Sequence, residues 1–431
     1  MNINSLKLKI KAINFTAKSI GIMFVFTSLT NFINFIYHVI MGRLLGPSEY
    51  GVLASVLSFL FIAGAIAVTI ETTSAKYAST YLAGHDTAKI KSFFYSITKR
   101  ILLFTIVIFA VILLFLNKFM DFLKIDSTFP LIFLGIMVIE NSLIAIGRGS
   151  IQGMKKFKSL GINLLLEAII KLGLGVILVY FGLKASGAIL GFMLATLFSY
   201  FLIFFPLKSI LRLKESEDIK SRIDIKKFYK DIFFILISII LISLFSYTDI
   251  ILVKHFFSSH ETGYYSAAAQ IGRIILFFPG AVNLVIFPRF SEKFVKKEKN
   301  QGTLIKSLAI IFIISAFFLI FYFLWPELII RLIYGNVYLD AAGLVFRYGI
   351  FMTFVSLIYV QVYYFISIEK FWYLIYFFLI IIEQIILIWV FNDSINSILL
   401  ILIMNSVILF LFNILLIFIN NRRTKRTILE G

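Results

Sequence analysis

Long apolar runs follow one another along almost the whole chain, and this succession limits what the chain can fold into. About 20 apolar residues in a helix cross the hydrocarbon core of a bilayer. Backbone polar groups find no water there, so each run must form a helix or belong to a closed barrel. The runs do not alternate polar with apolar residues, as barrel strands do. With 61% hydrophobic residues and a mean hydropathy of +1.00, the chain is predicted to be an all-α integral membrane protein.

Twelve of the apolar runs are long enough to count as membrane spans. No stretch between them is both long and polar enough to fold as a separate soluble domain. The predicted spans lie at 15–41, 52–83, 100–117, 129–152, 160–182, 185–211, 231–257, 263–290, 303–325, 342–368, 371–391 and 395–420.

The basic residues indicate how these spans are oriented. The chain has 41 Lys and Arg residues against 22 Asp and Glu residues, a formal net charge of +19. About thirty of the basic residues fall at the termini and in one alternating set of loops, and about seven fall in the opposite loops. Because cytoplasmic loops carry the excess of Lys and Arg, both termini are predicted to be cytoplasmic, with the protein in the cytoplasmic (inner) membrane. Basic residues placed in this way serve membrane topology, so we expect no nucleic-acid partner.

Several chemistries are excluded by composition. The chain has no cysteine, which removes disulfides and thiolate chemistry. The four histidines, His38, His85, His255 and His260, do not form a metal-ligand cluster. No G-x-x-x-x-G-K-[ST] segment is present, which argues against direct drive by ATP. We therefore expect no metal, no cofactor and no catalytic residue.

The longest cytoplasmic linker falls near the middle of the chain and divides the spans into two groups of six. The predicted organisation is an N-terminal six-helix bundle at 1–215, a linker at 216–230, and a C-terminal six-helix bundle with a short basic tail at 231–431.

A faint repeat agrees with this division. Glu49 and Gly51 follow the first span, and Glu261 and Gly263 follow the seventh, at an offset of about 212 residues. Each pair lies in an outer turn between the first two helices of a half. Parallel repeats of this kind are common in transporters, whose substrate sites lie between the repeats.

Ionisable residues inside the spans are the candidates for function. Each costs roughly 2.5–3.5 kcal/mol on insertion scales, so it should face a partner or a polar interior. Asn163, Glu167 and Lys171 lie at i, i+4 and i+8, on one stripe of a helix. The full set of charged residues is Glu71, Lys76, Glu140, Arg148, Glu167, Lys171, Asp249, Arg273 and Glu383.

Structural interpretations stay open for some of these residues. Glu167 and Lys171 can form an ion pair that only fixes packing, and Arg148 and Lys76 can lie near the interfaces and extend toward water. Pro279, followed by glycine, is expected to kink the eighth span, either as a gating element or as a purely structural feature.

Five segments, in order along the chain, resemble a known family. They are Gly42–Gly51, Arg148–Lys158, Asp249 with Gly263–Ala268, Phe287–Ser291 and Leu332–Tyr338. Their order and spacing are similar to those of the polysaccharide-biosynthesis and O-antigen flippases, in the multidrug/oligosaccharidyl-lipid/polysaccharide exporter superfamily. The resemblance implies two six-helix bundles around a central cavity. It also implies that a polyprenyl-linked sugar is carried from the inner to the outer leaflet.

The charged residues and this expected cargo together give a set of candidate sites. A lipid-linked sugar carries an anionic phosphate or pyrophosphate and many hydroxyls, which basic and amide side chains bind. Acids inside membranes often serve ion or proton coupling. The predicted substrate-binding residues are Arg43, which the resemblance supplies, with Lys76, Arg148, Asn163, Lys171, Gln270 and Arg273; the predicted coupling residues are Glu71, Asp249 and Glu383. The expected partners are the lipid-linked oligosaccharide, membrane lipids, and a polysaccharide polymerase or glycosyltransferases.

Two other functions remain in competition. A cation- or proton-coupled exporter of small molecules would use the same fold, but the basic residues inside the spans favour an anionic cargo. A membrane glycosyltransferase or polymerase would need a substantial loop with catalytic groups. The predicted outer loops are only about 5–18 residues long, and no Asp-x-Asp pair is present.

Overall fold

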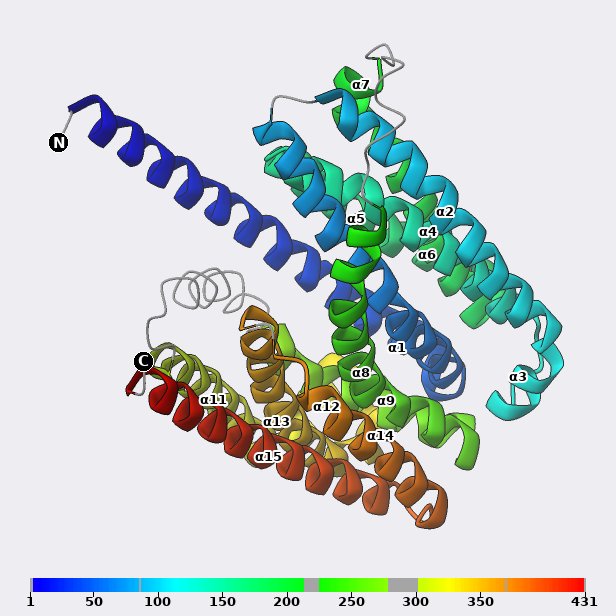
Figure 1. The fold of residues 1–431 in the computed structure, drawn as a ribbon. Helices are drawn as coiled ribbons and strands as arrows, with labels where there is room; N and C mark the ends of the chain where they lie inside the picture. Colours follow the sequence, from blue (N-terminus) through cyan, green and yellow to red (C-terminus); the bar gives the residue numbers. More distant parts are fainter. Residues whose placement is uncertain (1–2, 85–86, 213–224, 278–300, 369, 430–431) are drawn as a thin grey trace. The chain divides into compact units, whose positions relative to one another are not determined.

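The computed structural model is helical over nearly the whole of the part of the chain that it describes, which comprises residues 3–84, 87–212, 225–277, 301–368 and 370–429 (Figure 1). Within these residues, nine helical stretches are long and apolar enough to cross a membrane. Two of them, Gly21–Leu82 with 62 residues and Phe157–Lys208 with 52 residues, are long enough to cross twice, since one crossing takes about 20 residues. The prediction of an all-α, multi-pass membrane protein is confirmed.

The chain packs as two compact units, which we describe separately. The first unit comprises residues 1–45 and 63–236, and the second comprises residues 46–62 and 237–431. The predicted division into bundles at 1–215 and 231–431 stays a prediction. Most of the predicted linker lies outside the described residues, as does the predicted kink at Pro279.

Helix α1 (Ile3–Ala83) contains the first two predicted spans as two arms. The arms meet at Gly46, whose φ of 69° and ψ of 174° are not helical. Glycine adopts positive φ without the steric penalty that a side chain would impose. Pro47 follows, and its missing N–H costs nothing at the start of the second arm. From Pro47 to Ala83 the helix has no further break.

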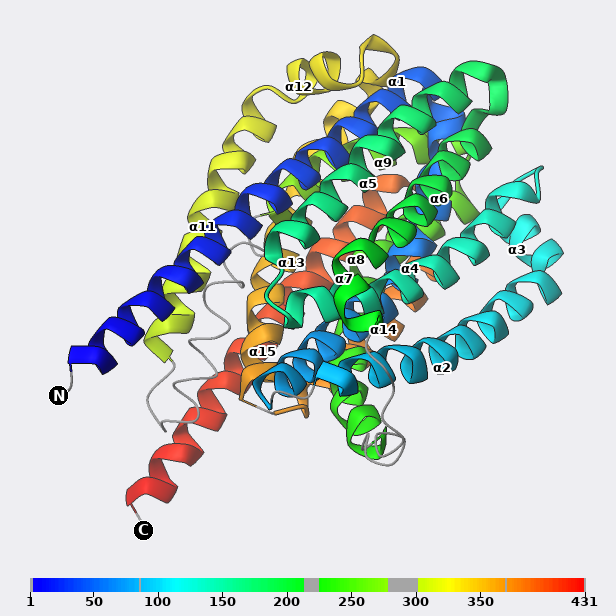
Figure 2. The same ribbon diagram turned by 90° about the horizontal axis from the view of Figure 1, so that it is seen from above.

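The body of the first unit is formed by four helices that pack side by side. Helix α4 packs against α2 and α6, and α5 packs against α6 (Figure 2). A π-helical turn at Val179–Leu183 joins α5 to α6. The bounds are α2 Thr87–Leu114, α3 Leu116–Leu123, α4 Phe129–Gly153, α5 Phe157–Leu178, α6 Lys184–Leu202 and α7 Phe204–Leu211.

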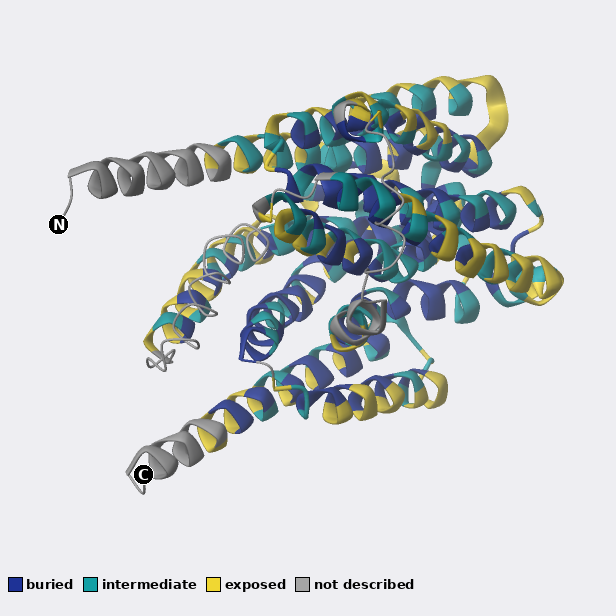
Figure 3. Cartoon of the chain, turned by 45° about the horizontal axis from the view of Figure 1, so that its top comes forward, coloured by how far each residue is buried: buried dark blue, intermediate teal, exposed yellow. Residues whose placement is uncertain are grey.

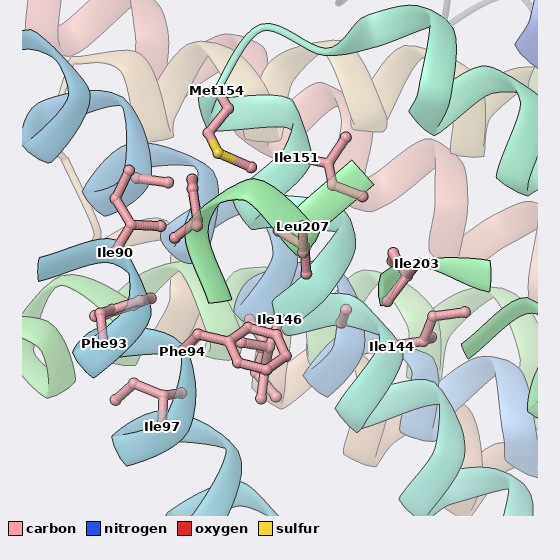
Figure 4. Close-up of a cluster of buried hydrophobic side chains, with 14 of the residues drawn as sticks. Ile90, Phe93, Phe94, Ile97, Ile144, Ile146, Ile151, Met154, Ile203 and Leu207 are labelled. Carbon is pink, nitrogen blue, oxygen red and sulfur yellow. The ribbon is translucent and has the colours of Figure 1, made fainter. Parts of the chain in front are cut away.

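An apolar cluster fixes α2, α4 and α7 together at one end of this unit (Figure 4). Phe93 and Phe94 of α2, Ile146 of α4 and Leu207 of α7 are all buried. Lipid tails are as apolar as isoleucine, so inside a bilayer this cluster gains close van der Waals packing rather than hydrophobic free energy. The packing holds α4, the helix that carries Arg148, in a defined position.

The second unit is arranged around α13. This helix packs against α9, α11 and α15, and α14 packs against α15 (Figures 1 and 2). Helix α8 begins in the first unit and continues into the second beyond Leu236. The bounds are α8 Ile225–Phe256, α9 Ser259–Gly272, α11 Gln301–Leu324, α12 Pro326–Ile333, α13 Ala342–Ser367, α14 Tyr373–Val390 and α15 Ile395–Leu429.

Helix α9 begins with a capping box in the turn that follows α8. The Ser258 hydroxyl accepts a hydrogen bond from the Glu261 backbone N–H at 3.2 Å, and the Glu261 carboxylate accepts one from the Ser258 N–H at 3.0 Å. The Ser258 hydroxyl also donates to this carboxylate at 2.7 Å. These hydrogen bonds hold the pKa of Glu261 below its usual value.

Exposed residues alternate with buried ones along several helices of this unit (Figure 3), and many of the exposed residues are large and apolar. On α11, Ile313 is 67% exposed and Phe323 is 66% exposed, and Ile375 on α14 is 64% exposed. A water-soluble monomer rarely exposes contiguous apolar surface of this kind. These faces are therefore the lipid-contacting surfaces of a membrane protein.

Candidate functional site

Arg148 is the centre of a polar network in the first unit. Its Nε donates to the Asn163 side-chain oxygen at 2.9 Å, and its guanidinium donates to the Ser199 hydroxyl at 3.1 Å. The same guanidinium forms an ion pair with the Glu167 carboxylate. The Asn163 amide in turn donates to the Ser199 backbone carbonyl at 2.8 Å. The network joins α4, α5 and α6, and it neutralises the Arg148 charge within the protein.

Two small residues on α4 bring this network close to the second arm of α1. A methyl carbon at Gly149 would lie 2.3 Å from the Glu71 carbonyl oxygen, and one at Gly153 would lie 2.4 Å from the Ala75 carbonyl oxygen. Glycines four residues apart allow helix backbones to approach closely in membranes. This approach places Glu71, which is half-buried, within electrostatic range of Arg148 and Glu167.

The first unit also holds a buried acid that the network does not satisfy. Glu140 on α4 is 8% exposed, and its Oε2 has no hydrogen-bond partner among the described residues. Its carboxylate lies within electrostatic range of Glu167. The carboxylates of Glu71 and Glu167 therefore lie within electrostatic range of Arg148, and that of Glu140 lies within electrostatic range of Glu167.

Lys171 lies two turns beyond Asn163 on α5, and it is buried. Its ammonium donates to the Asn34 side-chain oxygen of α1 at 2.5 Å. It also lies over two aromatic rings, 4.8 Å from the centre of Tyr37 and 4.4 Å from the centre of Phe192. Cation–π contacts of this kind stabilise a cation that is removed from water. Asn34 and the rings thus take the place of the predicted ion pair with Glu167, whose carboxylate is bound to Arg148.

Asp249 on α8 is the centre of a second network, in the second unit. It is fully buried, and its Oδ2 accepts hydrogen bonds from the hydroxyls of Tyr265 and Tyr348, each at 2.8 Å. Its Oδ1 lies 3.7 Å from the Arg273 guanidinium and has no hydrogen-bond partner among the described residues. One oxygen of the carboxylate is therefore fixed, and the other faces a cation without a short contact.

Arg273 completes this second network. Its guanidinium donates to the Ser246 carbonyl at 2.9 Å and lies 4.3 Å from the ring centre of Tyr247. It is buried, and its Nε has no hydrogen-bond partner among the described residues. A planar guanidinium with an open N–H and an aromatic ring beneath it is suited to bind a phosphate or carboxylate.

The other predicted site residues occupy different environments. Arg43 and Lys76 on α1 are exposed, and Gln270 on α9 is half-buried. Glu383 is exposed on α14, and no hydrogen bond or ion pair joins it to another described residue. The structure thus places Arg148, Asn163 and Glu71 around one centre and Asp249 and Arg273 around another, with Lys171 held separately by Asn34.

Several residues of these networks were not predicted as site residues. Ser199, Asn34, Tyr265 and Tyr348 are polar or aromatic residues within apolar spans, where hydroxyls and tyrosines are common. Helical spacing relates residues on one helix only, and these four reach their partners from other helices. The sequence therefore held no signal for them, whereas Glu140 was visible as a charge inside a span.

An apolar cavity of about 190 Å³ also lies within the first unit. Its lining includes Ile70 of α1, Ile101 and Phe104 of α2 and Ile232 of α8. The exposed Arg100 is its basic residue. The lining suits a hydrocarbon chain, with a cation available for an anionic headgroup.

The fold is that of a multi-pass membrane protein with a paired buried arginine in each unit, and comparison identifies the family. The chain belongs to the polysaccharide biosynthesis protein family, whose model matches residues 40–343. An uncharacterised membrane protein of Methanocaldococcus jannaschii is 30% identical over 190 residues. That match covers 41% of this chain and 46% of the relative, so it spans less than half of either protein.

Solved structures define the same fold at low sequence identity. An inward-facing multidrug resistance MATE family transporter of the MOP superfamily matches with a TM-score of 0.72 and 15% identity, covering 92% of this chain and 96% of that one. The lipid II flippase MurJ, in an inward closed conformation, matches with a TM-score of 0.65 and 17% identity over 91% of this chain and 87% of that one. A MOP superfamily transporter from Pyrococcus furiosus, described as having a binding pocket of reverse polarity, matches with a TM-score of 0.63 and 17% identity. That match covers 94% of this chain and 95% of the transporter. The predicted resemblance is therefore confirmed as family and fold.

Proposed function

We propose that this protein is a flippase that moves a polyprenyl-(pyro)phosphate-linked oligosaccharide from the inner to the outer leaflet of the cytoplasmic membrane. The family supports a role in polysaccharide biosynthesis. The fold, which it shares with multidrug transporters and a lipid II flippase, supports transport rather than catalysis. The cargo's anionic headgroup and hydroxyls cannot cross about 30 Å of hydrocarbon unaided.

The observation that carries this proposal is the state of Arg273. It is a buried cation stacked on Tyr247, and its Nε has no hydrogen-bond partner within the described part of the chain. The Asp249 carboxylate oxygen stands 3.7 Å from the guanidinium rather than in a short hydrogen bond. A phosphate oxygen would make a shorter, charge-assisted contact than Asp249 does. Sugar hydroxyls would find donors and acceptors among the neighbouring tyrosines and Gln270.

Binding of an anion at Arg273 has a consequence for Asp249. When the phosphate takes the guanidinium, the carboxylate loses its cation while it remains fully buried. An unpaired buried carboxylate is costly, so it takes up a proton or a cation. We assign to Asp249 the coupling role, with Tyr265 and Tyr348 holding the carboxyl group in place as it changes state.

The proposal also covers orientation, partners and the lipid tail. The excess of basic residues in one set of loops supports a topology with both termini in the cytoplasm, which a reporter fused to the C-terminus tests. The oligosaccharide would be supplied by glycosyltransferases and received by a polymerase. The prenyl tail remains in the lipid, and the apolar cavity beside Arg100 is suited to a part of it.

The test is leaflet-resolved translocation of a labelled polyprenyl-linked oligosaccharide by the purified protein in liposomes. Arg273→Ala is expected to lower the rate by more than about tenfold, because losing a charge-assisted contact costs roughly 1.5–3 kcal/mol. Asp249→Asn is expected to abolish the dependence of the rate on an imposed ion gradient. The matched control is Arg347→Ala, since Arg347 is exposed and is bound to Asn396. The flippase function is refuted if the oligosaccharide crosses equally fast in liposomes without the protein. The role of Arg273 is refuted if Arg273→Ala and Arg347→Ala translocate it at equal rates.

One observation favours a second candidate, a coupled exporter of small cations. Glu71 and Glu140 both lie within electrostatic range of Glu167, so three carboxylates share this region with the one guanidinium of Arg148, and an acidic site attracts a cationic cargo. This candidate predicts that liposomes accumulate a small organic cation against its gradient, and that Glu140→Gln stops the uptake. The flippase predicts no such accumulation.

A further inference from the structure

The apolar cavity of the first unit is lined by one face of each of three helices. Its volume is about 190 Å³. On each helix the apolar lining residues lie three or four positions apart, so they share a face. They are Ile66 and Ile70 of α1, Ile101 and Phe104 of α2, and Ile232 and Leu236 of α8. All of them belong to the first unit, which therefore contains the whole cavity.

Water finds few partners inside this cavity. Among the described residues, the lining contains one hydroxyl, that of Thr69, and this group already donates to the Ala65 carbonyl at 2.8 Å. An ordered water needs two to four polar partners, whereas an apolar cavity of about 150 Å³ stays dry and binds small hydrocarbons. The cavity is therefore suited to an apolar guest.

The rim of the cavity lies on an exposed apolar face of α2. Phe104 lines the cavity and is 54% exposed, and Val107 on the next turn is 61% exposed. Arg100, one turn before Phe104, also lines the cavity from an exposed position. Exposed apolar side chains on a membrane-spanning helix face the lipid. A hydrocarbon chain can therefore enter the cavity sideways from the bilayer.

The three helices change from apolar to charged sequence at the level of the cavity. The boundaries are Ile70–Glu71 on α1, Arg100–Ile101 on α2 and Asp231–Ile232 on α8. On the apolar side, α2 has no further charged residue as far as its end at Leu114, and α8 has none before Asp249. Apolar runs enter the hydrocarbon, while basic residues stay at the interface. The cavity thus lies just inside the hydrocarbon, with Arg100 at the depth of the lipid head groups.

Arg100 supplies the charge that an anionic head group needs. Arg100 and its neighbour Lys99 are both exposed, and no hydrogen bond or ion pair joins Arg100 to another described residue. A guanidinium binds phosphate through paired, charge-assisted hydrogen bonds. Under the proposed topology this side of the membrane is the cytoplasmic leaflet, where basic pockets between membrane helices bind anionic lipids.

We propose that the cavity is a binding site for an anionic phospholipid, with one acyl chain between α1, α2 and α8 and the phosphate at Arg100. The inference goes beyond the proposed transport function and does not require it. A prenyl chain would also fit the lining, but phospholipids make up the bulk of a bilayer. At comparable affinity, mass action fills the site with phospholipid. The bound chain completes the packing of the three helices where the protein leaves a space.

Lipids with brominated acyl chains test the site, because bromine quenches tryptophan fluorescence on contact. The chain has three tryptophans, Trp325, Trp372 and Trp389, which are first replaced by Phe. Phe104→Trp then places a single reporter at the rim, and Val107→Trp is the matched control, since it lies on the same exposed face outside the cavity.

Each protein is placed in vesicles of equal parts phosphatidylglycerol and phosphatidylcholine, with bromine on one lipid or the other. The ratio of quenching by the brominated anionic lipid to quenching by the brominated zwitterionic lipid measures the lipid preference at each reporter.

We expect the Phe104→Trp reporter to prefer the anionic lipid by about fivefold, the factor expected from one basic residue near the membrane surface. The Val107→Trp reporter should show almost no preference. Adding Arg100→Gln should remove the preference at the first reporter, whereas Lys158→Gln, which removes an exposed charge on α5, should leave it unchanged.

Two further variants test whether the chain enters the cavity. Leu236→Phe and Ile66→Phe each fill part of the space from a different helix without removing a charge. Each should lower the anionic preference at the Phe104→Trp reporter by at least about twofold, because the chain and the phosphate bind as one molecule. With two variants, the test survives if one of them fails to fold.

Three outcomes overturn the site. One is an equal preference at the two reporters. Another is an unchanged preference in both filling variants, which would mean that the lipid responds to surface charge alone. The third is relief of the quenching by a small molar fraction of polyprenyl phosphate, which would make the prenyl tail the occupant. The measurement involves no transport, so a failure to translocate the oligosaccharide would refute the proposed function and leave the lipid site standing.

Discussion

Removing the Arg148 side chain is the perturbation whose effect on stability the structure defines best. Arg148→Met keeps an unbranched apolar stem but removes the guanidinium, and with it the ion pair with Glu167 and the hydrogen bonds to Asn163 and Ser199. The side chains of Arg148 and Glu167 are 9% and 15% exposed, so the pair is screened little by solvent. Breaking a buried pair from one side costs roughly 3–5 kcal/mol. We expect a loss of about 3 kcal/mol in the free energy of unfolding, since Glu167 can take up a proton.

The converse change is expected to cost less. Glu167→Gln leaves Arg148 with both of its hydrogen bonds and with Glu71 within electrostatic range, so we expect a loss of about 1–2 kcal/mol. The variant that carries both changes should lose less free energy of unfolding than the two single variants lose together. The difference, which is the coupling energy of the pair, should be roughly 1.5–3 kcal/mol.

The assay is pulse proteolysis of the purified protein in mixed micelles across a denaturing detergent series, which reports unfolding of either unit. Arg347→Met is the control, because it removes an exposed arginine and should change stability by less than about 0.5 kcal/mol. The reasoning fails if Arg148→Met is no worse than this control. It also fails if the two single losses simply add in the double variant.

Two further predictions concern the second unit. Tyr265→Phe and Tyr348→Phe each remove a 2.8 Å hydrogen bond to the buried Asp249, and we expect each to cost about 1.5–3 kcal/mol by the same assay. Either change should cost less, about 0.5–1.5 kcal/mol, once Asp249 is Asn, because the amide oxygen is a neutral acceptor. For Glu261, the hydrogen bonds that lower its pKa in the folded state contribute stability above the unfolded pKa of about 4.3. That contribution is lost as the pH falls through the lower folded value. Over this acid range, the free energy of unfolding of the parent, measured by thermal unfolding, should fall more than that of Glu261→Gln. The difference should be less than about 1 kcal/mol, because the side chain is largely exposed. If the stabilities of the two proteins fall in parallel with pH, the assignment is contradicted.

The membrane-spanning helices were predictable from sequence because each span is a continuous run of apolar residues. The break between the first two spans was also visible in the sequence, since glycine is favoured just after a helix and proline at the first position of the next one, as at Gly46 and Pro47. The short amphipathic helices α3 and α12 were not predicted, because their eight residues are too few for a span. The packing of residues 46–62 with the second unit was not predictable, since it depends on contacts more than 200 residues apart in sequence.

The candidate sites were predictable only as lists of charges. Spacing along α5 joined Glu167 with Lys171, but the carboxylate pairs with Arg148 on another helix. Helical periodicity shows which residues share a face, and it does not show what that face meets. Asp249 and Arg273 were both singled out in sequence, but their direct ion pair was not, nor were the tyrosines that bind the carboxylate.

Each unit therefore pairs a buried arginine with its own carboxylate, Arg148 with Glu167 and Arg273 with Asp249. An unpaired buried charge costs several kcal/mol, so a carrier whose arginines lacked these partners would resist any movement with its site empty. With the partners present, each arginine has a carboxylate that offsets its charge while the site is empty. An anionic cargo that displaces a carboxylate restores neutrality only if that carboxylate gains a proton or a cation. Under the proposed function, charge balance at each pair would couple anion binding to a proton or cation, and Glu167→Gln or Asp249→Asn should leave anion binding intact while removing its dependence on the coupling ion.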